Sequence, residues 1–157
     1  MLFSTKAEYG VRLMVELGRQ PGSQPVSLGS VAEAENLPLS YLEHLVAKLR
    51  KAGLVTSTRG AHGGYRLAKP AAEIRMDAVV EALEGQIAPM ECFHDTPEGK
   101  VLCSHESDGD SACSTKLLWM RVQGGVSKAL AGTTLSELVE FSTKSEPTRA
   151  AALGSVA

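Results

Sequence analysis

Residues 40–69 read SYLEHLVAKLRKAGLVTSTRGAHGGYRLAK and decide the fold. Residues 40–52 predict an amphipathic helix, because their apolar side chains recur at helical spacing and form one stripe. These side chains are Leu42, Leu45, Val46 and Leu49. Gly53 ends the helix, and the segments Leu54-Val55 and Tyr65-Arg66-Leu67 flank a glycine-rich tip, which predicts a β-hairpin. A helix followed by a basic, glycine-tipped hairpin is typical of a winged helix-turn-helix, whose helix enters the major groove of DNA.

The same stretch concentrates positive charge. Six lysines and arginines stand against one acid, Glu43, so the stretch carries about +5 while the whole chain carries −2. The basic residues are Lys48, Arg50, Lys51, Arg59, Arg66 and Lys69. An acidic protein with one compact basic segment gathers its cations where a polyanion can bind. The alternative is that these side chains only form a solvated helix face.

Length and composition exclude several classes of protein. A chain of 157 residues suffices for one domain with an appended element. No run of 18 apolar residues occurs, and Met1 leads directly into a helix, so we expect neither a membrane span nor a signal peptide. Three cysteines cannot all pair within one chain, which favours a reducing, cytoplasmic setting. No combination of nucleophile, base and orienting group is visible, so we expect no enzyme and no catalytic residues.

Helices are predicted on both sides of residues 40–52, which we call the recognition helix. The expected helices are 5–18, 28–35 and 71–85, with a tight turn at Asn36-Leu37-Pro38. Together these elements make residues 1–85 a mainly α-helical DNA-binding domain with a small β-wing.

Four helix starts carry capping signals. Ser/Thr-x-x-Glu sequences begin at Thr5, Ser40 and Thr134, and each predicts a capping box in which the hydroxyl and the glutamate satisfy amides of the first turn. Ser27 is expected to cap the helix of residues 28–35. By these assignments Glu8 and Glu43 each have a plain structural role.

The C-terminal half divides into three segments. Residues 86–114 are polar and acidic, and they form a loop too long for a bare connector. Residues 115–142 predict a long apolar helix to about 131 and a short last helix to about Phe141. The long helix has more apolar surface than a small domain needs, so we interpret it as a dimerisation helix. The alternative is that it packs back on its own domain. Residues 143–157 are expected to be a disordered tail.

The loop of residues 86–114 holds all three cysteines, Cys92, Cys103 and Cys113, spaced Cys-x10-Cys-x9-Cys. Thiolates in a polar loop suit an iron-sulphur cluster, zinc or copper(I). A fourth ligand would be needed, for which the loop offers His94, Asp95, His105, Glu106, Asp108 and Asp110. The alternative is three unrelated reduced thiols.

The chain resembles the bacterial winged-helix iron-sulphur regulators of the IscR, NsrR and RirA type over about residues 1–141. The resemblance lies in five segments that occur in the family's order. They are Thr5-Lys6-Ala7-Glu8-Tyr9-Gly10-Val11-Arg12, Ser40-Tyr41-Leu42-Glu43, Leu49-Arg50-Lys51-Ala52-Gly53-Leu54-Val55, Arg59-Gly60 with Gly63-Gly64-Tyr65, and Thr134-Leu135.

This resemblance implies a homodimer that binds a palindromic operator in double-stranded DNA. It also implies that Cys92, Cys103 and Cys113 hold a 2Fe-2S or 4Fe-4S cluster. In the nitric-oxide sensor the fourth ligand is an acid of the other subunit, and the matching residue here is Glu8 of the partner subunit. The family's alternative, a histidine three residues after the last cysteine, is replaced by Lys116, and the cysteine spacing is wider than is usual in the family.

The predicted DNA contacts follow from the winged-helix assignment. Side chains in the N-terminal half of the recognition helix are expected at base edges, and the basic side chains of its last turn at phosphates or bases. The first group is Ser40, Tyr41, Glu43 and His44, and the second is Lys48, Arg50 and Lys51. The wing tip contains Gly60, Gly63 and Gly64 with Arg59 at its edge; Arg59 and Gly60 are predicted DNA contacts, and the resemblance implies that Arg59 enters the minor groove. Competing readings are a metal-free thiol-redox switch, a zinc-stabilised regulator, and a winged helix that binds protein.

Overall fold

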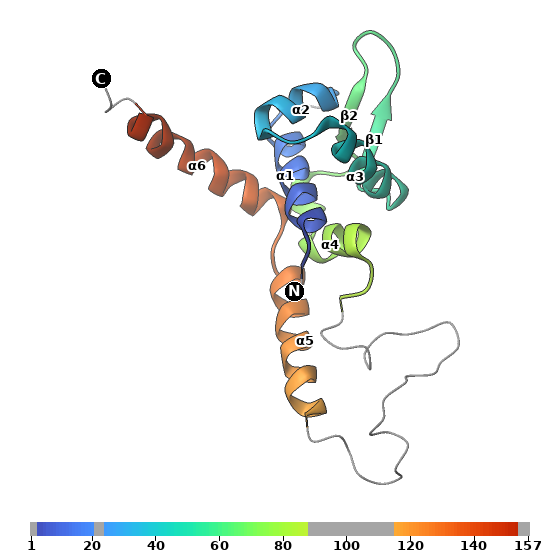
Figure 1. Cartoon of the computed structure of the whole chain (residues 1–157), viewed down its shortest axis with the longest axis vertical. Helices are drawn as coiled ribbons and strands as arrows, with labels where there is room; N and C mark the ends of the chain where they lie inside the picture. The colour runs from blue at the N-terminus through green and yellow to red at the C-terminus, as the bar shows by residue number, and fades with distance from the viewer. Residues whose placement is uncertain (1–2, 21–23, 88–114, 154–157) are drawn as a thin grey trace.

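The computed structural model describes residues 3–20, 24–87 and 115–153. Its elements follow one another as α1 (Thr5–Arg19), α2 (Leu28–Glu35), α3 (Leu39–Lys51), β1 (Val55–Thr58), β2 (Gly64–Leu67), the 3-10 turn η1 (Ala71–Glu73), α4 (Met76–Glu84), α5 (Lys116–Ala131) and α6 (Leu135–Leu153). Helices α1 to α4 and the hairpin gather into one body, from which α5 and α6 extend in different directions (Figure 1). The predicted fold class, a mainly α-helical winged helix-turn-helix, is confirmed.

One hydrophobic core joins all the helices of the body. The predicted stripe of α3 is buried in it, with Leu42 and Leu49 fully inaccessible to solvent. The stripe packs with Leu13 and Met14 of α1 and with Leu83 of α4, and each of these side chains is at most 1% exposed. Because one face of α3 is sealed in this way, the opposite face must lie in solvent.

The turn between α2 and α3 ends one helix and begins the next. Asn36 adopts the left-handed conformation at φ 51°, and the Leu37 amide bonds back to the Ala32 carbonyl at 3.0 Å. Pro38 follows as the N-cap of α3, so the predicted turn is confirmed. The predicted capping box at Ser40 is wrong: α3 begins at Leu39, and no side chain caps it. Glu43 therefore has no capping role.

The start of α1 is capped differently from the prediction. The cap is Ser4, whose hydroxyl accepts a hydrogen bond from the Lys6 amide at 3.1 Å, so the predicted box at Thr5 is wrong. The carboxylate that completes the cap comes from the end of α4. Glu84 Oε1 accepts hydrogen bonds from the Ser4 amide (3.0 Å), the Ala7 amide (3.2 Å) and the Ser4 hydroxyl. A contact across 80 residues thus replaces the local one.

Removing this carboxylate is expected to destabilise the fold in a pH-dependent way. Burial raises the pKa of Glu84, but the hydrogen bonds from Ser4 and Ala7 outweigh burial and hold the pKa below its ordinary value. The stabilisation is therefore complete above the unfolded-state pKa of roughly 4.3 and is lost as the pH falls through the folded pKa. Glu84→Gln should lower the free energy of unfolding by about 1–2 kcal/mol at pH 7.

Urea denaturation at pH 7 and at stepwise lower pH measures this effect. Glu81→Gln is the matched control, because Glu81 is exposed on the same helix. A difference between wild type and Glu84→Gln that stays constant down to acid pH would contradict the assignment.

The wing is a two-stranded antiparallel hairpin with Val55 paired to Leu67 and Thr58 to Gly64. The outer edge of β2 is also paired, since Val26 and Tyr65 exchange two backbone hydrogen bonds of 2.8 Å. Gly64 permits this approach, because a Cβ at its position would lie 2.4 Å from the Val26 carbonyl oxygen. Next to the tip, β2 is therefore hydrogen-bonded along both of its edges.

The predicted helix 71–85 is shorter in the structure. Only α4 is α-helical there, because the chain runs extended at Ile74 and Arg75 to pair with the connection between α5 and α6. The Leu135 amide bonds to the Ile74 carbonyl at 2.8 Å, and the Met76 amide to the Thr133 carbonyl at 3.0 Å. This pairing anchors the C-terminal helices to the body.

Two capping predictions are confirmed. Ser27 accepts a hydrogen bond from the Ser30 amide at 3.1 Å. Thr134 Oγ1 accepts from the Glu137 amide at 3.4 Å and donates to Glu137 Oε1 at 3.2 Å.

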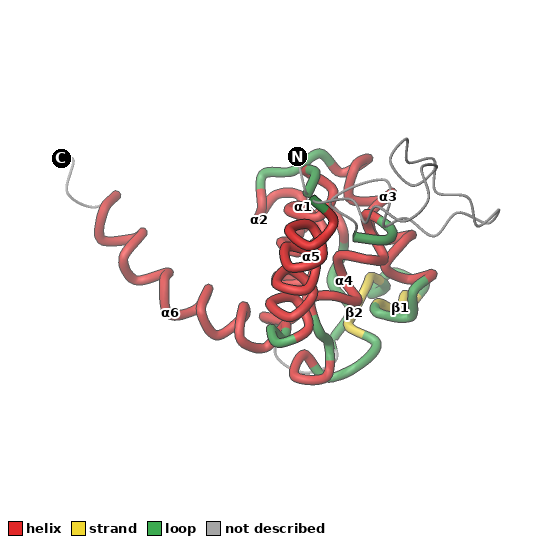
Figure 2. The backbone as a smooth tube through the Cα atoms, turned by 90° about the horizontal axis from the view of Figure 1, so that it is seen from below, coloured by secondary structure: helices red, strands yellow, loops and turns green. Residues whose placement is uncertain are grey.

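The helix that Thr134 begins is longer than predicted, because α6 runs to Leu153 rather than ending near Phe141. The predicted disordered tail from residue 143 is therefore wrong up to 153. The views in Figures 1 and 2 both show the far half of α6 pointing away from the body.

Helix α5 spans nearly its predicted range but lies on the surface. None of its sixteen residues, all of them described, is buried. Leu117, Leu118 and Met120 are 59%, 56% and 54% exposed. Only the end of the helix near Leu130 packs against the core.

Candidate nucleic-acid interface and cysteine segment

The outer face of α3 is a continuous exposed stripe. It consists of Ser40, His44, Ala47 and Lys51, which follow one another at steps of four, three and four residues and so share one side of the helix. This side lies opposite the buried stripe. Two of the predicted base readers and one predicted phosphate contact therefore project together into solvent.

The flank of α3 next to the wing is also polar. Glu43 and Arg50 lie on it, seven residues or about two turns apart, and both are exposed. Arg50 Nη1 donates a hydrogen bond to the Ser57 hydroxyl of β1 at 3.4 Å. The Glu43 carboxylate accepts no hydrogen bond from the described residues, so it stays available to a donor outside the chain.

The other flank of α3 makes contacts within its own protein, although Lys48 on it remains exposed. Tyr41 is half-buried, and its ring meets the Tyr9 ring edge to face, with 5.8 Å between centroids. Tyr41, predicted to lie at base edges, thus has an aromatic partner within the protein. Lys48, two turns later on the same flank, donates a hydrogen bond from Nζ to the Leu83 carbonyl of α4 at 2.8 Å. Sequence reasoning missed this partner, because a backbone carbonyl carries no mark in the sequence.

The wing tip is held in shape by glycines. Gly60 has φ 118°, a conformation that favours glycine, and the Gly63 amide bonds to its carbonyl at 2.9 Å. A Cβ on Gly63 would lie 2.4 Å from the Thr58 carbonyl oxygen. The tight turn leaves Arg59 exposed at the edge of the tip.

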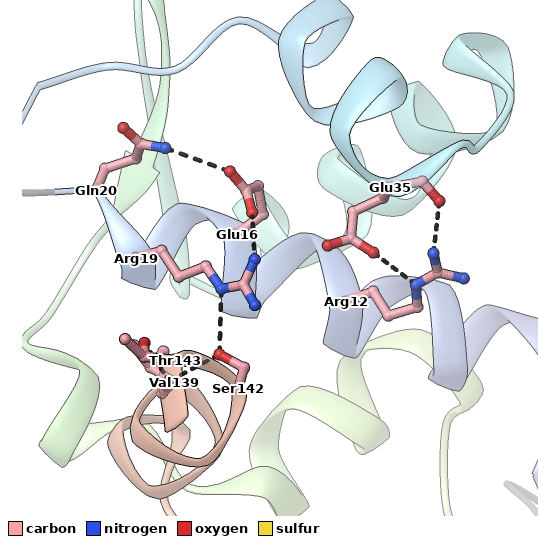
Figure 3. Close-up of polar contacts among 8 residues, drawn as sticks. All are labelled: Arg12, Glu16, Arg19, Gln20, Glu35, Val139, Ser142 and Thr143. Carbon is pink, nitrogen blue, oxygen red and sulfur yellow. Dashed lines mark hydrogen bonds and ion pairs between the residues drawn. The ribbon is translucent and has the colours of Figure 1, made fainter. Parts of the chain in front are cut away.

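Polar contacts fix α1 against the helix-turn-helix and against α6 (Figure 3). Arg12 Nε lies 2.8 Å from Glu35 Oε2, and Arg12 Nη2 donates to the Glu35 carbonyl at the end of α2. The Arg12 guanidinium also lies over the Tyr9 ring, 5.8 Å from its centroid. Further along α1, Arg19 Nε donates to the Ser142 hydroxyl of α6 at 3.1 Å. Sequence analysis did not assign these pairs, which join residues far apart in the chain.

The predicted cluster ligands Cys92, Cys103 and Cys113 lie outside the described residues, as do the candidate fourth ligands between 94 and 110. Within residues 3–20, 24–87 and 115–153, no group of three potential metal ligands occurs. Glu8, the proposed ligand from the partner, is exposed on the first turns of α1. Because Ser4 and Glu84 provide the cap, the Glu8 carboxylate has no capping bond and accepts none from the described residues. As a donor set, three thiolates and a carboxylate fit an iron-sulphur cluster.

Glu8 borders an apolar groove of about 560 Å³ between α1, α4 and α5. Val11, Val80 and Leu130 contribute to its walls. The Glu8 carboxylate therefore lies beside the end of α5 that holds Leu130, on the side of the body from which α5 extends.

Comparison with known proteins gives a consistent result. The family model Rrf2, described as "Iron-dependent Transcriptional regulator", matches residues 3–141. The regulator CymR of Bacillus subtilis is 38% identical over 141 residues, covering 90% of this chain and 91% of the relative. Its solved structure, described as that of the global cysteine regulator, has a TM-score of 0.73 and covers 90% of this chain and 98% of that one.

Relatives named IscR are similar to the same extent. IscR of Vibrio atlanticus is 35% identical over 140 residues, covering 89% of this chain and 76% of the relative. The solved structure of T. potens IscR has a TM-score of 0.71 at 35% identity and covers 90% of this chain and 88% of that one.

The helix-turn-helix with its wing and exposed stripe, together with these relatives, defines a winged-helix transcriptional regulator and not an enzyme. The chain belongs to the Rrf2 family. The family resemblance inferred from the sequence is thereby confirmed. Among the described residues, no helix has the length and apolar character needed to cross a membrane.

Proposed function

We propose that the chain acts as a homodimer that binds a palindromic site in double-stranded DNA. The observation that carries this proposal is the outer face of α3, where Ser40, His44 and Lys51 are exposed together beside the wing. Glu43 and Arg50 flank this face. In this arrangement Ser40, Glu43 and His44 meet base edges, while Arg50, Lys51 and Arg59 meet the phosphates or the minor groove.

Dimerisation through α5 is supported by its exposed apolar side chains. Leu117, Leu118 and Met120 would be unusual as solvent-facing neighbours on a monomer. At Gly124 and Gly125 a Cβ would meet nothing within 4 Å, so the glycines leave room for a second backbone. A two-fold axis through α5 would place two recognition helices in successive major grooves, roughly 34 Å apart.

We further propose that Cys92, Cys103 and Cys113 hold an iron-sulphur cluster, with Glu8 of the partner subunit as the fourth ligand. The cluster would supply a group whose state depends on iron, redox conditions or nitric oxide. The chain's own residues would hold this cluster. The thiolates would fix it to the segment before α5, and Glu8 would join that segment to the winged helix-turn-helix domain of the other protomer. The signal changes DNA affinity only as far as the protein's affinity for DNA differs between the two states of the cluster.

A metal-free thiol switch is the second candidate. It is favoured by the similarity to CymR, whose structure is described as that of a cysteine regulator. In this case the three cysteines would form reversible disulfides, and DNA affinity would follow thiol oxidation. A zinc-stabilised regulator uses the same thiolates without redox chemistry at the metal.

One preparation distinguishes these candidates. The full chain is purified without oxygen, and its visible absorbance, iron, acid-labile sulphide and zinc are measured. Iron and sulphide in equal amounts with a visible band support the cluster. A colourless protein with bound zinc, or one that forms disulfides on oxidation, overturns it.

Replacing Arg59 is expected to weaken DNA binding without affecting the cysteine segment. Loss of one charged contact in the minor groove costs about 1–3 kcal/mol, or roughly 5- to 150-fold in affinity. Fluorescence anisotropy with a duplex selected by the wild-type protein from a random pool measures the change for Arg59→Ala. His62→Ala is the control at the same exposed tip. Equal affinity of Arg59→Ala and wild type would exclude the wing from the interface.

Glu8→Ala is expected to weaken cluster retention while the cysteines still bind. A missing ligand leaves one iron open to solvent, so the visible band should bleach in air about 10- to 100-fold faster. Lys6→Ala serves as the control on the same exposed turn of α1. An unchanged bleaching rate would exclude Glu8 as a ligand.

A further inference from the structure

We propose that Lys48 is a positioning residue that couples α4 to the recognition helix, rather than a phosphate contact as its place in a basic helix suggests. The proposal rests on the proposed DNA-binding function. The Lys48 ammonium donates to the Leu83 carbonyl at 2.8 Å, which links the helix that reads DNA to the helix beneath it.

The geometry of α3 separates Lys48 from the other basic residues of its last turn. Lys51 belongs to the exposed stripe, and Arg50 lies on the flank that bonds to β1. Lys48 lies on the opposite flank with Tyr41, two turns away. Both residues of that flank contact neighbouring helices: Tyr41 meets Tyr9 of α1, and Lys48 meets α4.

The end of α4 is a site that favours a cation. The last four carbonyls of a helix have no partner within it, and the helix dipole places negative charge there. In α4 the Gly85 amide bonds to the Glu81 carbonyl. The Lys48 ammonium bonds to the Leu83 carbonyl two residues later and so completes this helix end from outside.

The other end of α4 is bonded to the connection that follows α5. The Met76 amide donates a hydrogen bond to the Thr133 carbonyl, and the Leu135 amide donates one to the Ile74 carbonyl. Helix α4 therefore has the α5–α6 connection at its start and the recognition helix at its end. A displacement of α5 relative to the body can reach α3 through α4, and the Lys48–Leu83 bond is the polar link at the last step.

The test compares Lys48→Met with Lys51→Met in the full-length protein. Methionine keeps the length of the side chain but removes the charge and the donor. Each variant is titrated with the duplex selected by wild type and with a scrambled duplex of the same length, at several salt concentrations. Lys48→Arg, which keeps a donor, is measured in parallel, and thermal melting checks that each variant is folded.

Lys51→Met should behave as a lost phosphate contact. It should weaken binding to both duplexes and reduce the slope of log affinity against log salt by about 0.9 per protomer. Lys48→Met should leave that slope unchanged and weaken only the selected duplex, by about 10-fold, because a misplaced helix loses base contacts before it loses phosphates. Lys48→Arg should restore most of the lost affinity.

A reduced slope and equal losses on both duplexes for Lys48→Met would make Lys48 a phosphate contact and overturn the inference. Unchanged affinity for both duplexes would overturn it as well, because no positioning role would remain. A wild-type protein without salt-dependent duplex binding would refute the proposed function itself, a result distinct from either.

Discussion

Cys103→Ala is expected to abolish the visible absorbance of the anaerobically purified protein. Three thiolates are the strongest ligands that the chain offers a cluster, and a site with two of them and a carboxylate lacks the donors to retain iron and sulphide. The expected change is complete loss of the band and of acid-labile sulphide. DNA affinity should become equal to that of the cluster-free wild-type protein.

The neighbouring Ser104→Ala is the matched control, because it alters the same segment without removing a thiolate. It should keep both the colour and the iron. If the colour survives in Cys103→Ala, Cys103 is not a ligand. If Cys103→Ala and wild type are both colourless but differ in disulfide formation, the metal-free thiol switch replaces the cluster.

Leu118→Glu is expected to convert the dimer to a monomer. Leu118 is 56% exposed on α5. In the proposed interface, each protomer buries its own Leu118 against the other. Losing the burial of one leucine costs about 1.5–3 kcal/mol, and each buried unpaired glutamate costs several kcal/mol more. With two copies in a symmetric interface, the dimer dissociation constant should rise by at least roughly 10³-fold.

Sedimentation equilibrium measures this change, and circular dichroism confirms that helix content is retained. Leu118→Met is the control, because it keeps an apolar side chain of similar volume and should remain dimeric. DNA affinity should fall as dimerisation is lost, since a monomer can occupy only one half-site. A Leu118→Glu protein that remains dimeric would place the interface elsewhere and leave α5 without this role.

The sequence predicted the reading domain well because its signals are local and periodic. The buried stripe of α3 follows from the spacing of Leu42, Leu45 and Leu49, and the turn follows from Asn36 and Pro38. These features depend on residues within a few positions of one another. For the same reason Ser27 and Thr134 were correctly assigned as caps.

Two of the failed predictions concern contacts between distant residues. The sequence around Thr5 fits a capping box, but the helix is capped one residue earlier, at Ser4, where Glu84 from the end of α4 accepts from the Ser4 and Ala7 amides. Tyr41 was expected at base edges, and its contact with the Tyr9 ring was not foreseen. A pattern read over four residues contains no information about such partners.

These failures also bear on the candidate site. The two acids whose predicted capping roles are absent, Glu8 and Glu43, are the same two for which a functional role was an alternative. Both carboxylates are exposed and accept no hydrogen bond from the described residues, so neither is committed to holding the fold. The cysteines lie outside those residues, and their role stays a prediction from the sequence.

The pairing of Tyr65 with Val26 divides the wing into stiff paired strands and a pliable tip. Strand β2 is hydrogen-bonded along both edges at Tyr65, whereas the hydrogen bond within the tip around Arg59 and Gly60 belongs to its own turn. Amide hydrogens should therefore exchange slowly in the strands and quickly at the tip. In the proposed DNA complex, the recognition helix is held at a set angle while Arg59 adjusts to minor grooves of different width, so that one scaffold tolerates variation at the outer positions of the binding site.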